Sequence, residues 1–175
     1  EISEVRDENK YNLFMGFPLQ QFTASEHIKV EDTMLYYYFK VVFGWDEHKV
    51  TPRLDWLFDM IALWIQFPRI RTETLLCITS EIQGCGKSFF FQFLQALLGE
   101  DLCAWYGSLA EYLEKYNMRN SGKKIKFIDD LAGAADKTDQ LFSGVTGTVA
   151  KYEKKYHDAI VIPEYSQTII TGNTD

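Results

Sequence analysis

The strongest constraint on the fold is the stretch from Thr74 to Gly99, where a short apolar segment, a glycine-containing turn and a longer apolar segment follow one another. The first segment, TLLCITS, contains β-branched residues and has the pattern of a strand covered on both faces. The last, SFFFQFLQALL, is polar at only three positions, and Gly99 follows it as a helix C′ residue would. The sequence therefore predicts a buried strand, a turn and a helix that is nearly all core.

The turn between these two segments, EIQGCGKS, has the composition of a phosphate-binding loop. Two glycines let the backbone curl so that successive N–H groups face one anion, and the following helix adds its positive N-terminal end. In such a loop Lys87 pairs with the β- and γ-phosphates, and the Ser88 hydroxyl ligates Mg²⁺. The alternative is a structural glycine turn before a core helix. The candidate nucleotide-binding residues are Gln83, Gly84, Cys85, Gly86, Lys87 and Ser88.

One position departs from the full pattern, G-x-x-x-x-G-K-[ST]. That pattern places a glycine at position 81, where this chain has Glu81. The residues that wrap a phosphate are the last four or five of the loop, so the departure does not remove the candidate site. A carboxylate near the loop entrance repels phosphates unless it points away, so the effect of Glu81 on nucleotide affinity depends on the direction of its side chain.

A nucleotide loop of this type needs an acidic partner on a neighbouring strand. The segment KKIKFIDDL ends an apolar run in Asp129 and Asp130, which suit Mg²⁺ binding through water and activation of an attacking water. Asn173 ends the strand-like segment TIITGN and could reach a γ-phosphate. Taken singly, a helix cap or solvated turn is the alternative for the two aspartates, and a plain Gly-Asn turn for Asn173.

A fourth candidate is the basic, aromatic segment AKYEKKYHD at 150–158. Lysines beside aromatic rings suit backbone contact and base stacking on single-stranded nucleic acid. The net charge of −7 gives no global attraction for nucleic acid, but a local basic patch can still bind it. A solvated surface turn is the alternative. The candidate residues are Lys154, Lys155, Tyr156 and His157.

Strand-like and helix-like segments alternate along the chain, which is typical of an α/β domain with a parallel sheet. We expect strands at 74–80, 102–106, 123–131 and 168–173, and helices at 26–43, from Thr51 (as N-cap) to 67, and at 88–98, 108–116 and 136–143. A lead-in segment with its helix covers 1–50, and the core domain covers 51–175. The chain starts without methionine and stops after TIITGNTD with no closing element, so we expect a piece of a longer protein.

The cysteines indicate the compartment. The chain has three, an odd number, and none has C-x-x-C spacing, which favours a reducing compartment and no zinc site. No signal peptide or membrane-spanning segment is recognisable in the sequence. We therefore expect an intracellular protein.

Taken in order, QGCGKS, KIKFIDDL, VAKYEKKYH and TIITGN resemble the motif series of the superfamily-three helicases, viral and plasmid replicative motors with an AAA+-type core. The chain looks most like the helicase domain of primase–helicase proteins from viruses and mobile elements, a group that YNLFMGFP and LDWLFDMIALWIQFP also resemble. The likeness covers roughly residues 10–175. It implies an AAA+-like P-loop NTPase domain of three layers with a parallel sheet, preceded by a short helical segment and truncated at the C-terminus.

The resemblance implies ATP and Mg²⁺ as cofactors and a role for each matching residue. Lys87 and Ser88 match the Walker A pair, and Asp129 and Asp130 the Walker B acids. Asn173 matches the polar sensor residue. Ser88 and Asp129 would hold the metal, while Lys87, Asp129, Asp130 and Asn173 would carry catalysis.

The segment EKKYH falls where the superfamily places a β-hairpin that grips single-stranded DNA in a central pore. Lys155 matches the lysine of its tip. The family often has a histidine directly after this lysine, whereas here Tyr156 intervenes before His157. Lys154, Tyr156 and His157 are therefore matched less closely than Lys155.

The function implied is that of an ATP-dependent replicative DNA helicase domain, working as a ring, expected to be a hexamer, in the cytoplasm or nucleus of a host cell. The resemblance allows a primase domain in the same full-length chain, and it places the arginine finger beyond residue 175. One alternative is a nucleotide-binding ring scaffold without efficient hydrolysis. Another, a P-loop kinase, is disfavoured because residues 127–175 contain no arginine for the usual lid.

Overall fold

The structure is a computed structural model that describes residues 17, 29–43, 50–130 and 135–173. Contacts within the chain divide it into two compact units, Glu1–Pro68 and Arg69–Asp175. This division falls after the second helix, whereas the sequence-based boundary between residues 50 and 51 lies in the first turn of that helix. Within the described ranges, no helix combines the length and the apolar character needed to cross a membrane.

The first unit contains two helices, α1 (Met34–Phe43) and α2 (Val50–Gln66), and a short 3-10 turn, η2 (Val30–Asp32). The helix expected over 26–43 starts only at Met34 in its described part, because Thr33 is extended and its hydroxyl accepts the Tyr36 N–H at 3.1 Å. α2 begins at Val50, so Thr51 lies inside its first turn and is not the N-cap. The fully buried Phe39 ring packs against the rings of Tyr38, Phe43 and Phe58.

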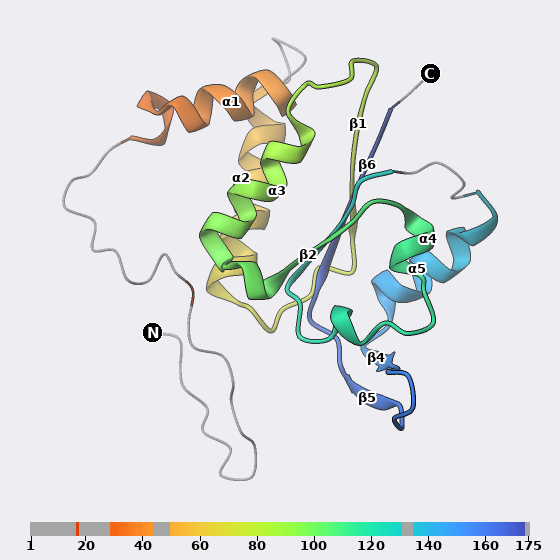
Figure 1. The fold of residues 1–175 in the computed structure, drawn as a ribbon. Coiled ribbons are helices and arrows are strands. Elements are labelled where there is room, and N and C mark those ends of the chain that lie inside the picture. The colour runs from red at the N-terminus through yellow and green to blue at the C-terminus, as the bar shows by residue number, and fades with distance from the viewer. Residues whose placement is uncertain (1–16, 18–28, 44–49, 131–134, 174–175) are drawn as a thin grey trace. The chain divides into compact units, whose positions relative to one another are not determined.

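The second unit is built on a four-stranded parallel sheet, as the sequence predicted (Figure 1). The strand order is β1-β6-β3-β2, so β6, the last strand in the chain, lies between β1 and β3. β3 is buried at every position, and β6 at every position but its last, as is typical of strands covered on both faces. The sequence predicted this for β1 instead, but β1 is an edge strand in which Ile78 alone is buried while Cys77 and Thr79 are exposed. The strands are β1 (Leu75–Ser80), β2 (Cys103–Tyr106), β3 (Ile125–Ile128) and β6 (Gln167–Asn173).

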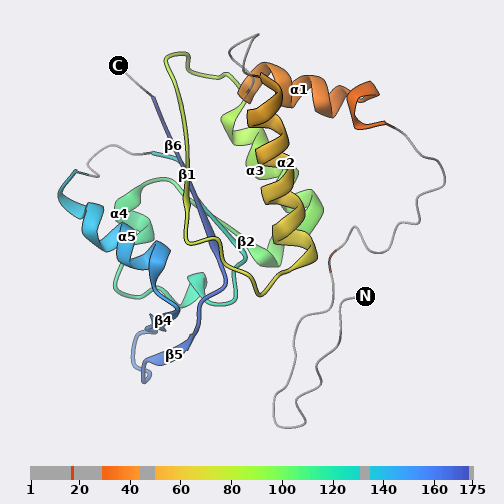
Figure 2. The same ribbon diagram turned by 180° about the vertical axis from the view of Figure 1, so that it is seen from behind.

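Helices cover both faces of this sheet (Figure 2). On one face α3 (Lys87–Leu98) sets Phe91 against the rings of Trp105 and Phe127, with centroids 5.2 and 5.4 Å apart. On the other face α4 (Leu109–Tyr112) and α5 (Thr138–Thr146) pack on the strands. The core cluster there consists of Tyr106, Leu109, Tyr112, Ile128, Leu141, Val145 and Ile170. Short 3-10 turns complete the unit: η3 (Glu100–Leu102), η4 (Met118–Asn120) and η5 (Ala135–Lys137).

The helices α3 and α4 also differ from the sequence-based expectation. α3 is not nearly all core: Phe90 and Phe91 are buried, but Phe89 is 47% exposed, because a helix lying on one sheet face buries only one side. α4 ends at Tyr112, well before residue 116. The chain leaves the helix there to bring Asn117 to the segment 151–153, where its side chain bonds the Lys151 carbonyl and the Glu153 N–H.

The segment 149–163 forms a separate antiparallel hairpin from β4 (Val149–Tyr152) and β5 (Ile160–Pro163). Its base is closed by a bond of 3.0 Å from the Glu164 N–H to the Thr148 carbonyl. The resemblance implied a β-hairpin at this place, and the backbone forms one. The hairpin leads directly into β6 and lies at the amino-terminal end of the parallel sheet, opposite the glycine-containing turn (Figure 1).

Candidate nucleotide-binding site at the carboxyl edge of the sheet

The glycine-containing turn joins the carboxyl end of β1 to the amino end of α3. Gly84 and Gly86 have φ angles of +74° and +101°, in the left-handed region that favours glycine. Gly86 is the N-cap of α3, which begins at Lys87. The two glycines therefore let the chain turn from strand to helix so that the first N–H groups of α3 point out of the carboxyl edge of the sheet.

Lys87 reaches across this edge to the end of β6. Its Nζ lies 2.7 Å from Asn173 Oδ1 and 3.1 Å from the Gly172 carbonyl, and it also donates to Ser80 Oγ at 2.9 Å. The strand register makes these contacts possible, because Ser80 pairs with Asn173 at the matching ends of β1 and β6. Two residues that are 86 positions apart, and that the sequence proposed for one site, are thus in direct contact.

Ser80 is a residue of this site that sequence reasoning missed. Besides accepting from Lys87, its hydroxyl lies 2.7 Å from the Ile82 carbonyl and 3.2 Å from Cys85 Sγ. It therefore holds the turn against the strand that precedes it. The only sequence signal for this role is its position as the last residue of a strand before a glycine-containing turn.

Asp129 follows β3, the strand on the other side of β6. The fully buried Thr171 donates its hydroxyl to the Asp129 carbonyl at 2.8 Å and to its carboxylate Oδ1 at 3.1 Å. The Asp129 N–H is held by the Tyr106 carbonyl at 2.8 Å. Thr171 is a second residue that the sequence did not single out, although it shares a face of β6 with Asn173. Asp130, the next residue, is exposed.

The remaining loop candidates lie on the surface of the same edge. Gln83, Gly84 and Ser88 are exposed, Cys85 is partly buried, and Glu81 is exposed at the start of the turn. Among the described residues, no three His, Cys, Asp or Glu side chains are grouped closely enough to hold a metal ion. The Mg²⁺ ligands Ser88 and Asp129 stay a prediction.

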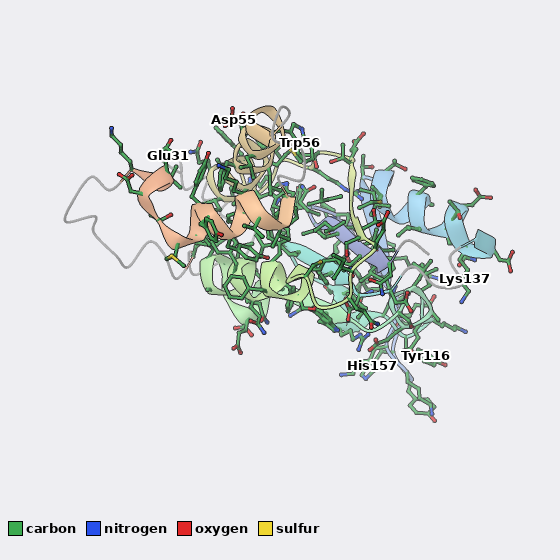
Figure 3. All side chains as sticks on the ribbon, turned by 90° about the horizontal axis from the view of Figure 1, so that it is seen from above. Glu31, Asp55, Trp56, Tyr116, Lys137 and His157 are labelled. Carbon is green, nitrogen blue, oxygen red and sulfur yellow. The ribbon has the colours of Figure 1, made fainter. Side chains whose placement is uncertain are left out.

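The basic residues of the hairpin lie elsewhere. Lys154, Lys155, Tyr156 and His157 are all exposed in the connection between β4 and β5, and Figure 3 shows His157 at the periphery of the molecule. Tyr156 has a φ of +66° and is 90% exposed, with Lys155 Nζ 5.1 Å from its ring centroid. The structure therefore separates these four residues from the carboxyl-edge site, and a role in binding nucleic acid stays a prediction.

Comparison with protein families gives one match. The model of the Family of unknown function (DUF5906) matches residues 78–175, more than half of the chain. This span includes the glycine-containing turn, both aspartates, the hairpin and Asn173. No curated protein sequence matches the chain.

Comparison with solved structures gives 39 matching chains. An A form apo structure of the NrS-1 C-terminal region has a TM-score of 0.71 at 18% identity over 93% of this chain and 37% of that one. A second apo structure of the region has a TM-score of 0.73 at 18% identity, over 93% of this chain and 38% of that one. The chain thus spans less than two fifths of these solved chains, and at this identity the likeness concerns the fold alone.

Proposed function

The chain belongs to DUF5906, a family of unknown function, and we propose that its second unit is the ATP-hydrolysing part of a DNA helicase of the superfamily-three type. The fold would be an AAA+-like P-loop NTPase. The observation that carries the proposal is the contact of 2.7 Å between Lys87 Nζ and Asn173 Oδ1 at the carboxyl edge of a parallel sheet. In open α/β sheets this edge is where ligands bind.

The residues at this edge fit a magnesium nucleotide. The turn offers N–H groups in a left-handed backbone, a helix N-terminus and a lysine, which together suit a row of phosphates. The Ser88 hydroxyl and the Asp129 carboxylate are oxygen ligands of the kind that Mg²⁺ prefers. When bound, Mg²⁺-ATP supplies a phosphoanhydride bond that water can cleave, and a divalent charge that offsets the charge of its phosphates.

The chain's own residues divide the work of hydrolysis. Lys87, held in place by Ser80 and β6, positions its ammonium group on the β- and γ-phosphates. Asp130 accepts a proton from the attacking water, and Asn173 orients that water with its amide. Thr171 fixes the direction of the neighbouring Asp129 carboxylate. An arginine from another subunit of a ring, which we propose to be a hexamer, would complete the site.

The hairpin supplies the proposed contact with single-stranded DNA. Lys155 would bind the phosphate backbone, with support from Lys154 and His157, and the exposed Tyr156 ring would stack on a base. The free thiols of Cys77, Cys85 and Cys103 support action in a reducing compartment, which we propose to be the cytoplasm or nucleus of a host cell. A primase domain in the same full-length protein would fit this role.

One observation favours a second function. Glu81 is exposed at the start of the turn, at the position where the phosphate-loop pattern has glycine. A carboxylate there weakens phosphate binding. The protein would then act as a ring scaffold that binds nucleotide without hydrolysing it efficiently.

The deciding experiment measures ATP hydrolysis by the full-length protein with and without single-stranded DNA. We expect hydrolysis that rises with DNA and vanishes in Lys87→Ala, while Lys40→Ala, which removes an exposed lysine from α1, behaves as wild type. Hydrolysis that persists in Lys87→Ala contradicts the site. Nucleotide binding without hydrolysis in a folded, oligomeric protein supports the scaffold.

A further inference from the structure

A buried ion pair lies at the opposite end of the sheet from the candidate nucleotide site. Lys126 Nζ on β3 is 2.7 Å from Glu164 Oε2, and the two side chains are only 4% and 5% exposed. Tyr152 on β4 donates its hydroxyl to the same carboxylate oxygen and accepts from Lys126 at 3.2 Å. The second carboxylate oxygen accepts the Ser166 N–H at 2.9 Å. Every polar group of the trio therefore has a partner.

The Glu164 carboxylate is ionised at neutral pH. Burial by itself raises its pKa, but the Lys126 ammonium and the hydrogen bonds from Lys126, Tyr152 and Ser166 outweigh burial and lower the pKa of Glu164 to about 2. Separating two buried charges is costly, because each ion then stays in the protein interior without its partner. The trio thus ties three chain segments together at one fixed geometry.

The three residues connect the hairpin to strands that end at the candidate nucleotide site. Tyr152 ends β4, and Glu164 follows β5, so both belong to the base of the hairpin. Lys126 lies on β3, roughly 10 Å along the strand from Asp129 at a rise of about 3.3 Å per residue. Beyond Glu164 the chain runs into β6, which ends at Asn173. The hairpin is therefore attached to β3 by the ion pair and to β6 by the backbone, and both strands lead to the candidate nucleotide site.

A pocket of about 260 Å³ that is partly open to solvent lies beside this tie, and Lys126, Tyr152 and Glu164 line it together with residues of α5. Close-packed contacts resist displacement, whereas a pocket leaves room for the side chains that line it to shift. The hairpin base therefore combines a strong attachment to β3 with free volume on the side of Ser143 and Gly144. With this attachment and this free space, the hairpin can move as a unit together with β3.

We propose that Lys126, Tyr152 and Glu164 act as a joint that transmits the state of the nucleotide site to the hairpin. The three are positioning residues: they touch neither nucleotide nor DNA, and they act through β3 and β6. This inference rests on the proposed function, because it needs a nucleotide at the carboxyl edge.

The test uses variants that remove the charges and keep the shape. Lys126→Met/Glu164→Gln loses both charges, and the amide of glutamine can still bond Tyr152 and Ser166. Tyr152→Phe is a milder variant that removes one hydroxyl, and it serves if the double variant does not fold. The matched control is Lys151→Met/Glu153→Gln, the same pair of substitutions at an ion pair of 2.7 Å on the surface of the same hairpin, with exposures of 63% and 26%.

The measurement is amide hydrogen exchange of the full-length protein with and without a non-hydrolysable Mg²⁺-ATP analogue. In wild type and control we expect the analogue to change exchange both in the turn 81–88 and in the hairpin 149–163. In Lys126→Met/Glu164→Gln the change in the turn persists, and the change in the hairpin falls at least threefold. Tyr152→Phe shows the same loss in part.

The outcomes separate the two proposals. A change in the turn with an equal hairpin response in wild type and joint variants overturns the joint and leaves the nucleotide site standing. No change in the turn of the wild type overturns the nucleotide site, and the joint with it. A loss of the hairpin response in the control as well shows that surface charge, not the buried trio, carries the effect, and this also overturns the joint.

Discussion

The two ends of the parallel sheet use polar residues in opposite ways. At the carboxyl edge, the charged Lys87 ammonium donates a hydrogen bond to the neutral amide of Asn173, which is exposed. At the amino-terminal end, Lys126 and Glu164 form a buried pair of opposite charges. A half-buried lysine held by neutral acceptors can still bind an anion, whereas a buried lysine paired with a carboxylate cannot without breaking the pair. The carboxyl edge is therefore suited to binding a ligand, whereas the ion pair at the amino-terminal end holds the structure together.

The largest effect that we expect at the carboxyl edge is on turnover. Asp130→Asn removes the proposed proton acceptor, so hydrolysis should fall by a factor of about 10² to 10⁴. Nucleotide affinity should stay within about threefold, because the loop and Lys87 are unchanged. Single-turnover hydrolysis and equilibrium nucleotide binding measure the two quantities. Turnover within a factor of ten of the wild type would remove Asp130 from the catalytic role.

The largest effect that we expect at the amino-terminal end is on stability. Glu164→Ala leaves the Lys126 ammonium buried without its carboxylate, and it should lower the free energy of unfolding by about 3–5 kcal/mol. Urea denaturation followed by circular dichroism measures the change. Lys126→Met/Glu164→Gln, which leaves no unpaired charge, should lose much less. Equal losses in the two variants would show that lost packing, not an unpaired charge, causes the destabilisation.

A pH effect should also come from this end of the sheet. Burial, aided by Arg71 and opposed by Glu164, lowers the pKa of Lys124 from its ordinary value of 10.5 to about 8. Between these two values the unfolded chain binds more protons at this lysine than the folded chain does, so the free energy of unfolding should rise with pH across that window. The gain is at most about 3 kcal/mol at 1.36 kcal/mol per pKa unit.

Lys124→Met isolates this contribution, because all other titrating groups are kept. The stability of the wild type relative to the variant should increase from pH 8 to pH 10.5, as measured by urea denaturation at several pH values. A constant difference across the window would mean that Lys124 titrates alike in both states. Its bonds to the Ile70 and Tyr165 carbonyls, at 3.1 and 3.0 Å, would then hold the ammonium form as well as water does.

A smaller effect should come from the backbone of the turn. Gly84 has a φ of +74°, and a Cβ added there meets nothing within 4 Å, so Gly84→Ala isolates backbone strain. The expected cost is about 1–2 kcal/mol in the free energy of unfolding. Gly107→Ala is the control, since its φ is not positive and its added Cβ meets only Glu111 Oε2 at 3.5 Å. A similar cost in both variants would contradict an origin in the left-handed backbone.

The smallest effect on stability, and a selective one on activity, should come from the hairpin tip. Lys155→Ala removes an exposed side chain, so the free energy of unfolding should change by less than about 0.5 kcal/mol. Basal hydrolysis should be unchanged, while its stimulation by single-stranded DNA should be lost. An unchanged stimulation would identify 153–157 as a surface turn.

Local pattern was enough to predict the four strands of the parallel sheet and the main helix of the second unit, but not the strands β4 and β5 of the hairpin. TLLCITS and TIITGN form β1 and β6, since runs of this length with β-branched residues favour strands. Only β6 is buried on both faces, whereas β1 lies at the edge of the sheet with Cys77 and Thr79 exposed. The glycines of the turn were recognisable because only their backbone freedom allows a left-handed conformation between strand and helix. The catalytic, metal and nucleic-acid roles of the candidate residues remain predictions from the sequence.

Tertiary structure decided what no local pattern contains. The order β1-β6-β3-β2 brings Asn173 to Lys87 and makes Thr171 the support of Asp129, and strand order depends on contacts between distant segments. The early end of α4 has the same origin, because Asn117 bonds the hairpin. Lys126 and Glu164, which lie 38 positions apart, read as ordinary surface charges in the sequence, and only folding buries them as a pair. By itself the sequence determined which elements and which reactive side chains the chain has, since these follow from local spacing. The tertiary structure decided which of those side chains meet, because burial and pairing are properties of the packed sheet.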